Sequence, residues 1–128
     1  MQRLRTRAQF QALLARPPVA RTAHFVLHRL PLPTPDDPAA DGLFKPGDVA
    51  WLGAMAPKRW ARRAVTRNAI RRQVYAVGES ALSPLATGAR LVRLRAAFAP
   101  AQFPSASSAA LRRAVRAELI QLFAREPA

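Results

Sequence analysis

A run of arginines in the middle of the chain is the part of this sequence best suited to bind another molecule. Positions 56–77 hold seven basic residues and no acidic one, and no acid occurs between Asp48 and Glu79. Like charges four residues apart on a helix repel each other, so an anion is needed to offset them. Arginine suits phosphate because its planar guanidinium donates two parallel hydrogen bonds and also stacks on bases. The run predicts a polyanion-binding segment, with a solvated charged face as the alternative.

The spacing of this run predicts a helix from 57 to about 77. Pro57 fits the first helical turn and Gly78 fits the helix end. Arg63, Arg67 and Arg71 recur at every fourth residue and would form one stripe. On or beside that stripe we expect Trp60, Ala64, Asn68 and Tyr75. We expect Val65, Ala69 and Ala76 to lie on the back face of the helix and to pack against the sheet. Ile70 and Val77 would lie on a flank of this back face, and Arg62 and Arg72 would lie nearer to it than the other arginines do.

The two aromatic residues of the run have two interpretations that the sequence leaves open. Trp60 and Tyr75 could stack on unpaired bases, as aromatic side chains do in proteins that bind single-stranded RNA. They could equally pack partly into the core. Asn68 can hydrogen-bond a base edge, a sugar or a phosphate.

Residues elsewhere do not predict chemistry by the protein itself. His24 and His28 are the two histidines and would share a face of a strand, but no acid near them in sequence completes a site. The seven acids are scattered, with Asp36 and Asp37 in a Pro-rich stretch, and suggest no general acid/base pair. We therefore expect no catalytic residue and no metal site in the protein.

Composition narrows the class of partner and the compartment. The 128 residues suit one domain, predicted to span 1–128, and half of them are hydrophobic. The net charge is +14 and arginine supplies 19 of the 21 basic residues, which favours nucleic acid as partner. The absence of cysteine fits a reducing cytoplasm. No apolar run approaches the ~18 residues of a membrane span, so we expect no membrane partner.

Periodicity and breakers predict a small α+β fold with helices packed on a sheet. The predicted helices are Thr6–Ala15, with Thr6 and Gln9 as a capping box, the basic helix, and a last helix from Ser107 or Ser108 to about Arg125 with an apolar stripe of Leu111, Val115, Leu119 and Leu122. The predicted strands are Thr22–Leu30, Asp48–Met55 and Ala89–Ala97. Residues 31–47 are predicted to form a mobile Pro-rich surface loop.

The basic run resembles the signature of the bacterial ribonuclease P protein family. The matching residues are Lys58-Arg59, Arg62-Arg63, Arg67-Asn68 and Ile70-Arg71-Arg72. In the family, Arg-Asn-Arg is followed by a hydrophobic and two basic residues; here Ala69 replaces the second Arg. Trp60 stands where Asn is usual, and Gln73-Val74-Tyr75-Ala76 replaces the usual Arg-Glu ending. The helix with Phe10 and the strand Phe25-Val26-Leu27-His28 are compatible with the family order.

The resemblance implies a function and a fold. It implies the protein subunit of an endoribonuclease that removes 5′ leaders from precursor tRNA, with the chemistry and Mg²⁺ held by the RNA subunit. The implied partners are ribonuclease P RNA and precursor tRNA, with no obligate protein partner, in the cytoplasm. The implied fold is a central mixed sheet with three helices in the order α-β-β-β-α-β-α and a left-handed βαβ crossover.

The resemblance also assigns roles to particular residues. The implied contacts to the catalytic RNA are Lys58, Arg59, Arg62, Arg63, Arg67, Asn68, Arg71 and Arg72. The implied leader-binding cleft contains Phe10, Phe25 and His28. The alternatives are a basic RNA-binding protein such as a small ribosomal protein, a protein that places the helix in a DNA major groove, and a membrane-surface protein.

Overall fold

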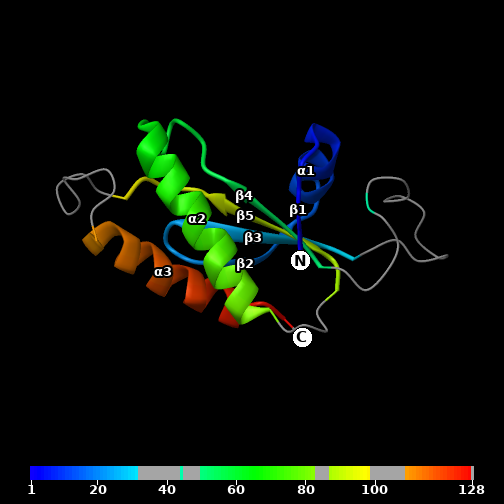
Figure 1. Ribbon diagram of the computed structural model, residues 1–128. Coiled ribbons are helices and arrows are strands. Elements are labelled where there is room, and N and C mark those ends of the chain that lie inside the picture. Colours follow the sequence, from blue (N-terminus) through cyan, green and yellow to red (C-terminus); the bar gives the residue numbers. More distant parts are fainter. Residues whose placement is uncertain (32–43, 45–49, 83–86, 99–108, 128) are drawn as a thin grey trace.

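One mixed β-sheet with helices on both of its faces makes up the protein (Figure 1). The structure is a computed structural model that describes residues 1–31, 44, 50–82, 87–98 and 109–127. The elements in these ranges are β1 (Gln2–Arg3), α1 (Arg7–Leu14), β2 (Pro18–Arg21), β3 (Phe25–Leu30), β4 (Trp51–Met55), α2 (Ala64–Ala81), β5 (Ala89–Leu94) and α3 (Ala109–Ala124). The strand order is β1-β4-β5-β3-β2. The predicted α+β class is confirmed.

The two faces of the sheet are covered by different helices. Helices α2 and α3 pack against each other and against β4, β3 and β2, whereas α1 contacts β3 and β5 from the other side. We call these the α2/α3 face and the α1 face. Side chains alternate between them along each strand, so Leu27 joins the core under α2 and α3 while Leu30 joins the smaller core under α1.

The β4–α2–β5 unit is a left-handed crossover. Strands β4 and β5 are parallel neighbours, with Trp51 paired to Ala89 and Met55 paired to Arg93. Figure 1 shows α2 in front of the sheet and β5 below β4, while both strands run towards the left. For a viewer who has α2 in front of the sheet and looks along the strand direction, β5 therefore lies to the left of β4. This arrangement is a left-handed crossover, whereas right-handed crossovers are strongly preferred. The expectation drawn from the family resemblance is confirmed.

The edge strands are where the sequence-based prediction was incomplete. The predicted strand Thr22–Leu30 is confirmed as β3 from Phe25 onward. Residues 22–24 instead form the turn that joins β3 to the antiparallel β2, and Thr22 N–H donates to the Phe25 carbonyl at 2.9 Å across this turn. Strand β1 has two residues and is held by pairing with β4. Most of the predicted loop 31–47 lies outside the described residues, but Phe44 is described and is buried against Trp51.

Helix α1 begins as its sequence predicts. The Thr6 hydroxyl accepts from Gln9 N–H at 3.1 Å, and the Gln9 side-chain oxygen accepts from Thr6 N–H at 3.1 Å. This reciprocal capping box satisfies donors that the first helical turn leaves without partners. The box fixes the direction of α1 across the sheet, where Leu13 is buried and Phe10 is partly buried.

Helix α2 differs from the prediction at both ends and in its packing face. It begins at Ala64 rather than 57 and continues through Gly78 to Ala81. Gly78 does not end the helix. It allows α2 to pack closely against β4, because a Cβ at this position would collide with the Leu52 side chain. The residue expected to pack on the sheet, Val65, is 49% exposed, whereas the flank residue Ile70 is 2% exposed.

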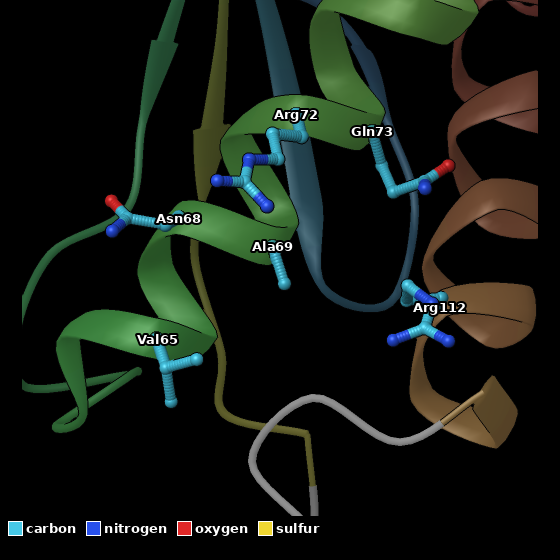
Figure 2. Close-up of a pocket in the computed structure, with 6 residues that line it drawn as sticks. All are labelled: Val65, Asn68, Ala69, Arg72, Gln73 and Arg112. Carbon is cyan, nitrogen blue, oxygen red and sulfur yellow. The ribbon is translucent and has the colours of Figure 1, made fainter.

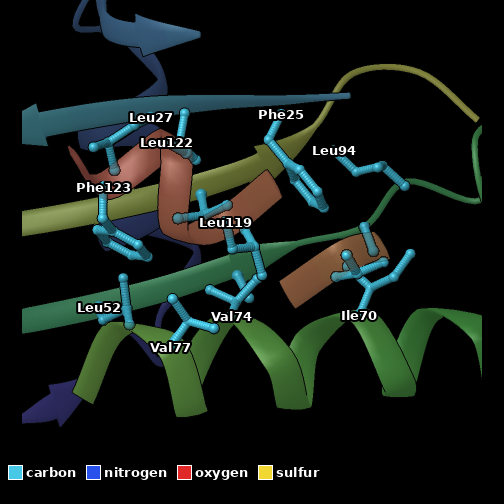
Figure 3. Close-up of a cluster of buried hydrophobic side chains, with 14 of the residues drawn as sticks. Phe25, Leu27, Leu52, Ile70, Val74, Val77, Leu94, Leu119, Leu122 and Phe123 are labelled. Carbon is cyan, nitrogen blue, oxygen red and sulfur yellow. The ribbon is translucent and has the colours of Figure 1, made fainter. Parts of the chain in front are cut away.

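The larger core is built from β3, β4, β5, α2 and α3 (Figure 3). Phe25 is 0% exposed and lies among these side chains, which include Leu94 and Leu119. The α3 stripe of Leu111, Val115, Leu119 and Leu122 is buried, as predicted. Because α2 presents Ile70, Val74 and Val77 to this core, its remaining faces are left to the surface.

Candidate nucleic-acid interface

The residues predicted to contact RNA form one surface segment, residues 58–72, which we call the basic segment. The exposed members are Lys58, Arg59, Arg62, Arg63, Asn68 and Arg72. Arg67 and Arg71 are partly exposed. The structure therefore brings together all eight predicted residues on one stretch of surface, and none of them is buried.

The first half of the basic segment is a turn, not a helix. The N–H groups of Trp60 and Ala61 both donate to the Pro57 carbonyl, at 3.0 and 3.1 Å, and helix α2 follows only after Arg63. The predicted stripe is therefore wrong at Arg63, which is the N-cap residue. Lys58, Arg59 and Arg62 are exposed on this turn.

Arg67 fixes this turn to the helix. Its Nη1 donates to the Ala61 carbonyl at 3.0 Å and to the Arg62 carbonyl at 2.7 Å. Guanidinium groups suit such double donation because their donors are fixed in a plane. Arg67 therefore positions the turn as well as adding charge to the surface.

Arg71 and Tyr75 follow Arg67 along one flank of α2. Arg71 Nη1 donates to Asn68 Oδ1 at 3.2 Å, so the amide of Asn68 is oriented by its neighbour. The Arg3 guanidinium lies 3.9 Å from the centre of the Tyr75 ring. Arg3, which the sequence analysis missed, thus extends the basic surface from α2 onto β1. Its position depends on the β1–β4 pairing, which is not evident from periodicity.

Packing explains Trp60 and Tyr75 better than base stacking does. Both are partly buried against the larger core, and Trp60 Nε1 is buried without a hydrogen-bond partner among the described residues. The Arg59 guanidinium lies 5.0 Å from the centre of the Trp60 ring, and the Arg3 guanidinium lies 3.9 Å from the centre of the Tyr75 ring. Each ring therefore already supports an arginine by a cation–π contact.

A hollow of about 260 Å³ lies between α2 and α3, and we call it the α2–α3 hollow. Its lining residues are Val65, Asn68, Ala69, Arg72, Gln73 and Arg112. Figure 2 shows Ala69 and Gln73 on the α2 side and the Arg112 guanidinium across from Ala69. Arg112 is a second residue that sequence analysis missed, because it lies 43 positions from Ala69 along the chain.

The helix dipoles add to the positive potential of this surface. Neither α2 nor α3 has an acid in its first turn, and Figure 1 shows both helices beginning at the same end of the molecule. A helix N-terminus carries roughly half a positive charge. Arginines there are destabilising by themselves, so Arg63, Arg67 and Arg112 would all be stabilised by a bound anion.

The three residues predicted to line a leader cleft do not lie together. Phe25 is on the α2/α3 face and fully buried, so it cannot line a cleft with Phe10 on the α1 side. The prediction for Phe25 is wrong because residues alternate between faces along β3. Phe10 is partly buried over the smaller core, and a role at the edge of a cleft is compatible with this position.

His28 is on the α1 face, where it is 3% exposed, and its Nδ1–H donates to the Arg16 carbonyl at 2.8 Å. Burial lowers the pKa of His28 below its ordinary value of 6.5; the hydrogen bond with Arg16 opposes the shift, and the charges of Arg93 and Arg21 add to it. His28 is therefore a neutral residue beneath the surface rather than a cleft wall.

Arg93 is the better candidate on this face. It lies beside Val26 of β3 and Met55 of β4 in the sheet register and is partly exposed. Its Nε is buried without a hydrogen-bond partner among the described residues. The sequence shows that Arg93 and Arg95 alternate with Val92 and Leu94. It does not show which face of the sheet Arg93 occupies.

A histidine–carboxylate pair exists that the sequence did not predict. Glu118 of α3 accepts from His24 Nδ1–H at 2.7 Å, from His24 backbone N–H at 2.7 Å and from the Thr22 hydroxyl at 2.6 Å. The His24 ring also stacks on Phe98 at 4.0 Å. Since His24 precedes β3 and faces α3, it does not share a face with His28 as expected. These contacts tie the β2–β3 turn to α3.

The described residues do not fit a Mg²⁺ site. Within them, no group of three or more His, Asp or Glu side chains could hold a metal ion. Glu118 is engaged as above, and Glu126 is paired with Arg90 at 2.5 Å. As for membranes, none of the described helices has the length and hydropathy that crossing a bilayer requires.

Comparison with known proteins agrees with this geometry. The family model described as Ribonuclease P matches residues 1–122. The ribonuclease P protein component of Ralstonia pickettii is 35% identical over 122 residues, which are 94% of this chain and 76% of the relative. That of Bordetella parapertussis is 33% identical over 123 residues, covering 96% of this chain and 89% of the relative.

Solved structures show the same fold. The RNase P protein of Staphylococcus aureus has a TM-score of 0.65 at 18% identity, covering 97% of this chain and 94% of that one. A mutant of the S. aureus protein with defective mRNA degradation activity gives a TM-score of 0.63 at 17% identity, covering 95% and 85%. By its family match, its relatives and its fold, this chain belongs to the ribonuclease P protein family.

Proposed function

We propose that this protein component of ribonuclease P binds the RNA subunit through the basic segment and holds the 5′ leader of precursor tRNA on the α1 face of the sheet. The observation that carries the first half is the convergence of Lys58, Arg59, Arg62, Arg63 and Arg72 on one exposed surface without an acid. The chain is part of an endoribonuclease complex. A cytoplasmic location follows from the proposed substrate, the precursor tRNA of bacteria.

Phosphate recognition accounts for the charge distribution of the basic segment. The charges come from two elements, the turn 57–63 and the first turns of α2, and not from one regular helix. Each phosphate contact releases a counterion, so RNA affinity falls with salt by about 0.7–0.9 log units per contact and per log unit of salt. A generic ribosomal protein is not favoured, because the family match covers residues 1–122.

The proposed leader site uses Phe10, Met55 and Arg93. Single-stranded RNA is held by basic side chains that follow its backbone and by apolar or aromatic side chains against its bases. Arg93 supplies charge next to Met55 and Val26, and Arg21 lies on the other side of Val26 in the sheet register. Phe10 lies on α1, which crosses the same face.

Cleavage itself belongs to the RNA subunit in this proposal, and Mg²⁺ is held mainly by that RNA. Support comes from the three described carboxylates: Glu118 and Glu126 are engaged with His24 and Arg90, Glu79 is exposed on α2, and the three form no cluster. The role of the protein is then to position RNA and leader, which raises the effective concentration of the scissile bond at the catalytic RNA.

Binding to the RNA subunit from the same genome, compared with duplex DNA of equal length, tests this proposal. We expect tighter binding to the RNA at equal salt and a log–log salt slope that corresponds to several phosphate contacts. A flat salt plot would contradict the electrostatic account. Preference for the duplex DNA would favour a protein that inserts α2 into a groove.

A further inference from the structure

The backbone around Arg3 is fixed by the residues on either side of it in β1. Gln2 N–H donates to the Ala50 carbonyl and Leu4 N–H donates to the Leu52 carbonyl, both at 2.9 Å. Leu4 is buried in the smaller core under α1. Because side chains alternate between the faces of a sheet along a strand, Arg3 points to the opposite face, where α2 lies.

The ring of Tyr75 supports the Arg3 side chain on this face. The Arg3 guanidinium lies over the ring, 3.9 Å from its centre, and Arg3 is exposed to solvent. Tyr75 is itself partly buried against the larger core, which holds the ring in place. A cation–π contact holds a guanidinium by its charge and leaves its N–H donors for other partners.

These donors have no protein acceptor in the described part of the chain. None of the ion pairs and side-chain hydrogen bonds found there involves the Arg3 guanidinium. Glu79 lies one helical turn after Tyr75, but it is exposed and does not pair with Arg3. The Arg3 guanidinium is therefore held in position while its charge and its hydrogen-bonding groups remain available to a ligand.

Arg3 brings positive charge to a part of α2 that has none of its own. Residues 73–81 of this helix contain no lysine or arginine. Arg71 of the basic segment lies one helical turn before Tyr75, so their side chains are neighbours on the helix surface. The charged line of the basic segment therefore continues past Tyr75 onto β1 through Arg3.

A backbone phosphate of RNA suits this arrangement. The planar guanidinium donates two parallel hydrogen bonds to phosphate oxygens. A single exposed arginine gives little affinity for free phosphate, but an RNA already bound to the basic segment presents further phosphates at high effective concentration. Since the Tyr75 ring already holds the side chain, less conformational entropy is lost when the phosphate binds.

We infer that Arg3 binds a backbone phosphate of the RNA subunit and that Tyr75 positions its guanidinium for this contact. The inference rests on the proposed function, and it adds β1 to the RNA-binding surface of this chain. It also gives Tyr75 a role in RNA binding that requires no stacking of the ring on a base.

A pair of charge-removing variants tests the phosphate contact by titration of the RNA subunit. Arg3→Gln is compared with Arg7→Gln, which removes an exposed arginine from α1, on the other side of the sheet from α2. We expect Arg3→Gln to weaken RNA binding roughly tenfold, as loss of a charge-assisted contact does. Its salt slope should fall by about 0.7–0.9. Arg7→Gln should remain close to the unaltered protein in both measurements.

A double-mutant cycle tests the positioning role of Tyr75. Tyr75→Leu removes the ring but keeps an apolar side chain against the core, and we expect it to weaken binding about two- to fivefold. Tyr75→Phe keeps the ring and should bind as the unaltered protein does. In the Arg3→Gln background, Tyr75→Leu should have no further effect, because the side chain that the ring positions is then absent. Thermal melts confirm that all variants are folded.

The outcomes separate this inference from the proposed function. If the unaltered protein binds the RNA and Arg3→Gln loses no more affinity than Arg7→Gln, the phosphate contact is wrong and the proposed function stands. If Tyr75→Leu weakens binding equally with and without Arg3, the positioning role of Tyr75 is wrong. If the unaltered protein does not bind the RNA, both the inference and the proposed function are wrong.

Discussion

Replacing Arg67 should disturb RNA binding through the shape of the turn before α2 and not only through lost charge. Arg67 Nη1 donates to the Ala61 and Arg62 carbonyls at 3.0 and 2.7 Å. Arg67→Lys keeps the charge, but an ammonium on a flexible stem does not reproduce the planar geometry of the guanidinium. We therefore expect Arg67→Lys to lose most of the affinity that Arg67→Ala loses.

The expected magnitude follows from the two hydrogen bonds. A bond of this kind contributes about 1 kcal/mol net when it is partly exposed to water. Two such bonds amount to about 2 kcal/mol, which corresponds to about 30-fold in Kd if the whole contribution is lost on binding. The loss arises because Lys58, Arg59 and Arg62 must then be ordered by the RNA itself.

The assay is a titration of labelled ribonuclease P RNA with each variant at fixed salt. Arg113→Lys is the matched control, because Arg113 is exposed on α3 and lies outside the basic segment. We expect Arg113→Lys to bind as tightly as the unaltered protein. If Arg67→Lys also binds normally, the positioning role of Arg67 is refuted and only its charge matters.

Three further predictions concern the α1 face and the core. Arg93→Gln should weaken binding of precursor tRNA with a leader by roughly three- to tenfold, as for one phosphate contact, and leave leaderless tRNA unchanged; equal losses for both would point to misfolding. Phe25→Ala should lower the free energy of unfolding by about 3–5 kcal/mol, measured by urea denaturation, and should not discriminate between leader lengths. His28 has a pKa lowered from 6.5 in the folded protein, so the unfolded chain takes up more protons below that pH. Its contribution to stability is complete above about pH 6.5 and is lost as the pH falls. The decrease in unfolding free energy from pH 7 to pH 5 should therefore be smaller in His28→Gln; an identical pH profile would rule out this role of His28.

Local patterns in the sequence predicted the features that depend on neighbouring residues. The capping box of Thr6 and Gln9 and the apolar stripe of α3 are both present as expected. The eight predicted RNA contacts of the basic segment also lie at the surface, because an acid-free run of arginines has few ways to be buried.

Features that depend on distant parts of the chain could not be predicted in the same way. The packing face of α2 was misplaced because Val65 and Ile70 are both apolar, and only the position of β4 and α3 decides which is buried. Phe25 was assigned to a cleft by the family resemblance, and the face of the sheet that it occupies could not be predicted from its strand alone. Arg3 and Arg112 join the basic surface through strand pairing and helix packing, which no local spacing encodes.

Above all, we propose that this chain assists cleavage of precursor tRNA as a partner of a catalytic RNA. The most direct test is cleavage of precursor tRNA by the ribonuclease P RNA of the same genome at low Mg²⁺, with and without the protein. We expect the protein to restore cleavage at the mature 5′ end, and we expect the stimulation to decline with added salt. Binding of that RNA without any stimulation, or no binding at all, would contradict it.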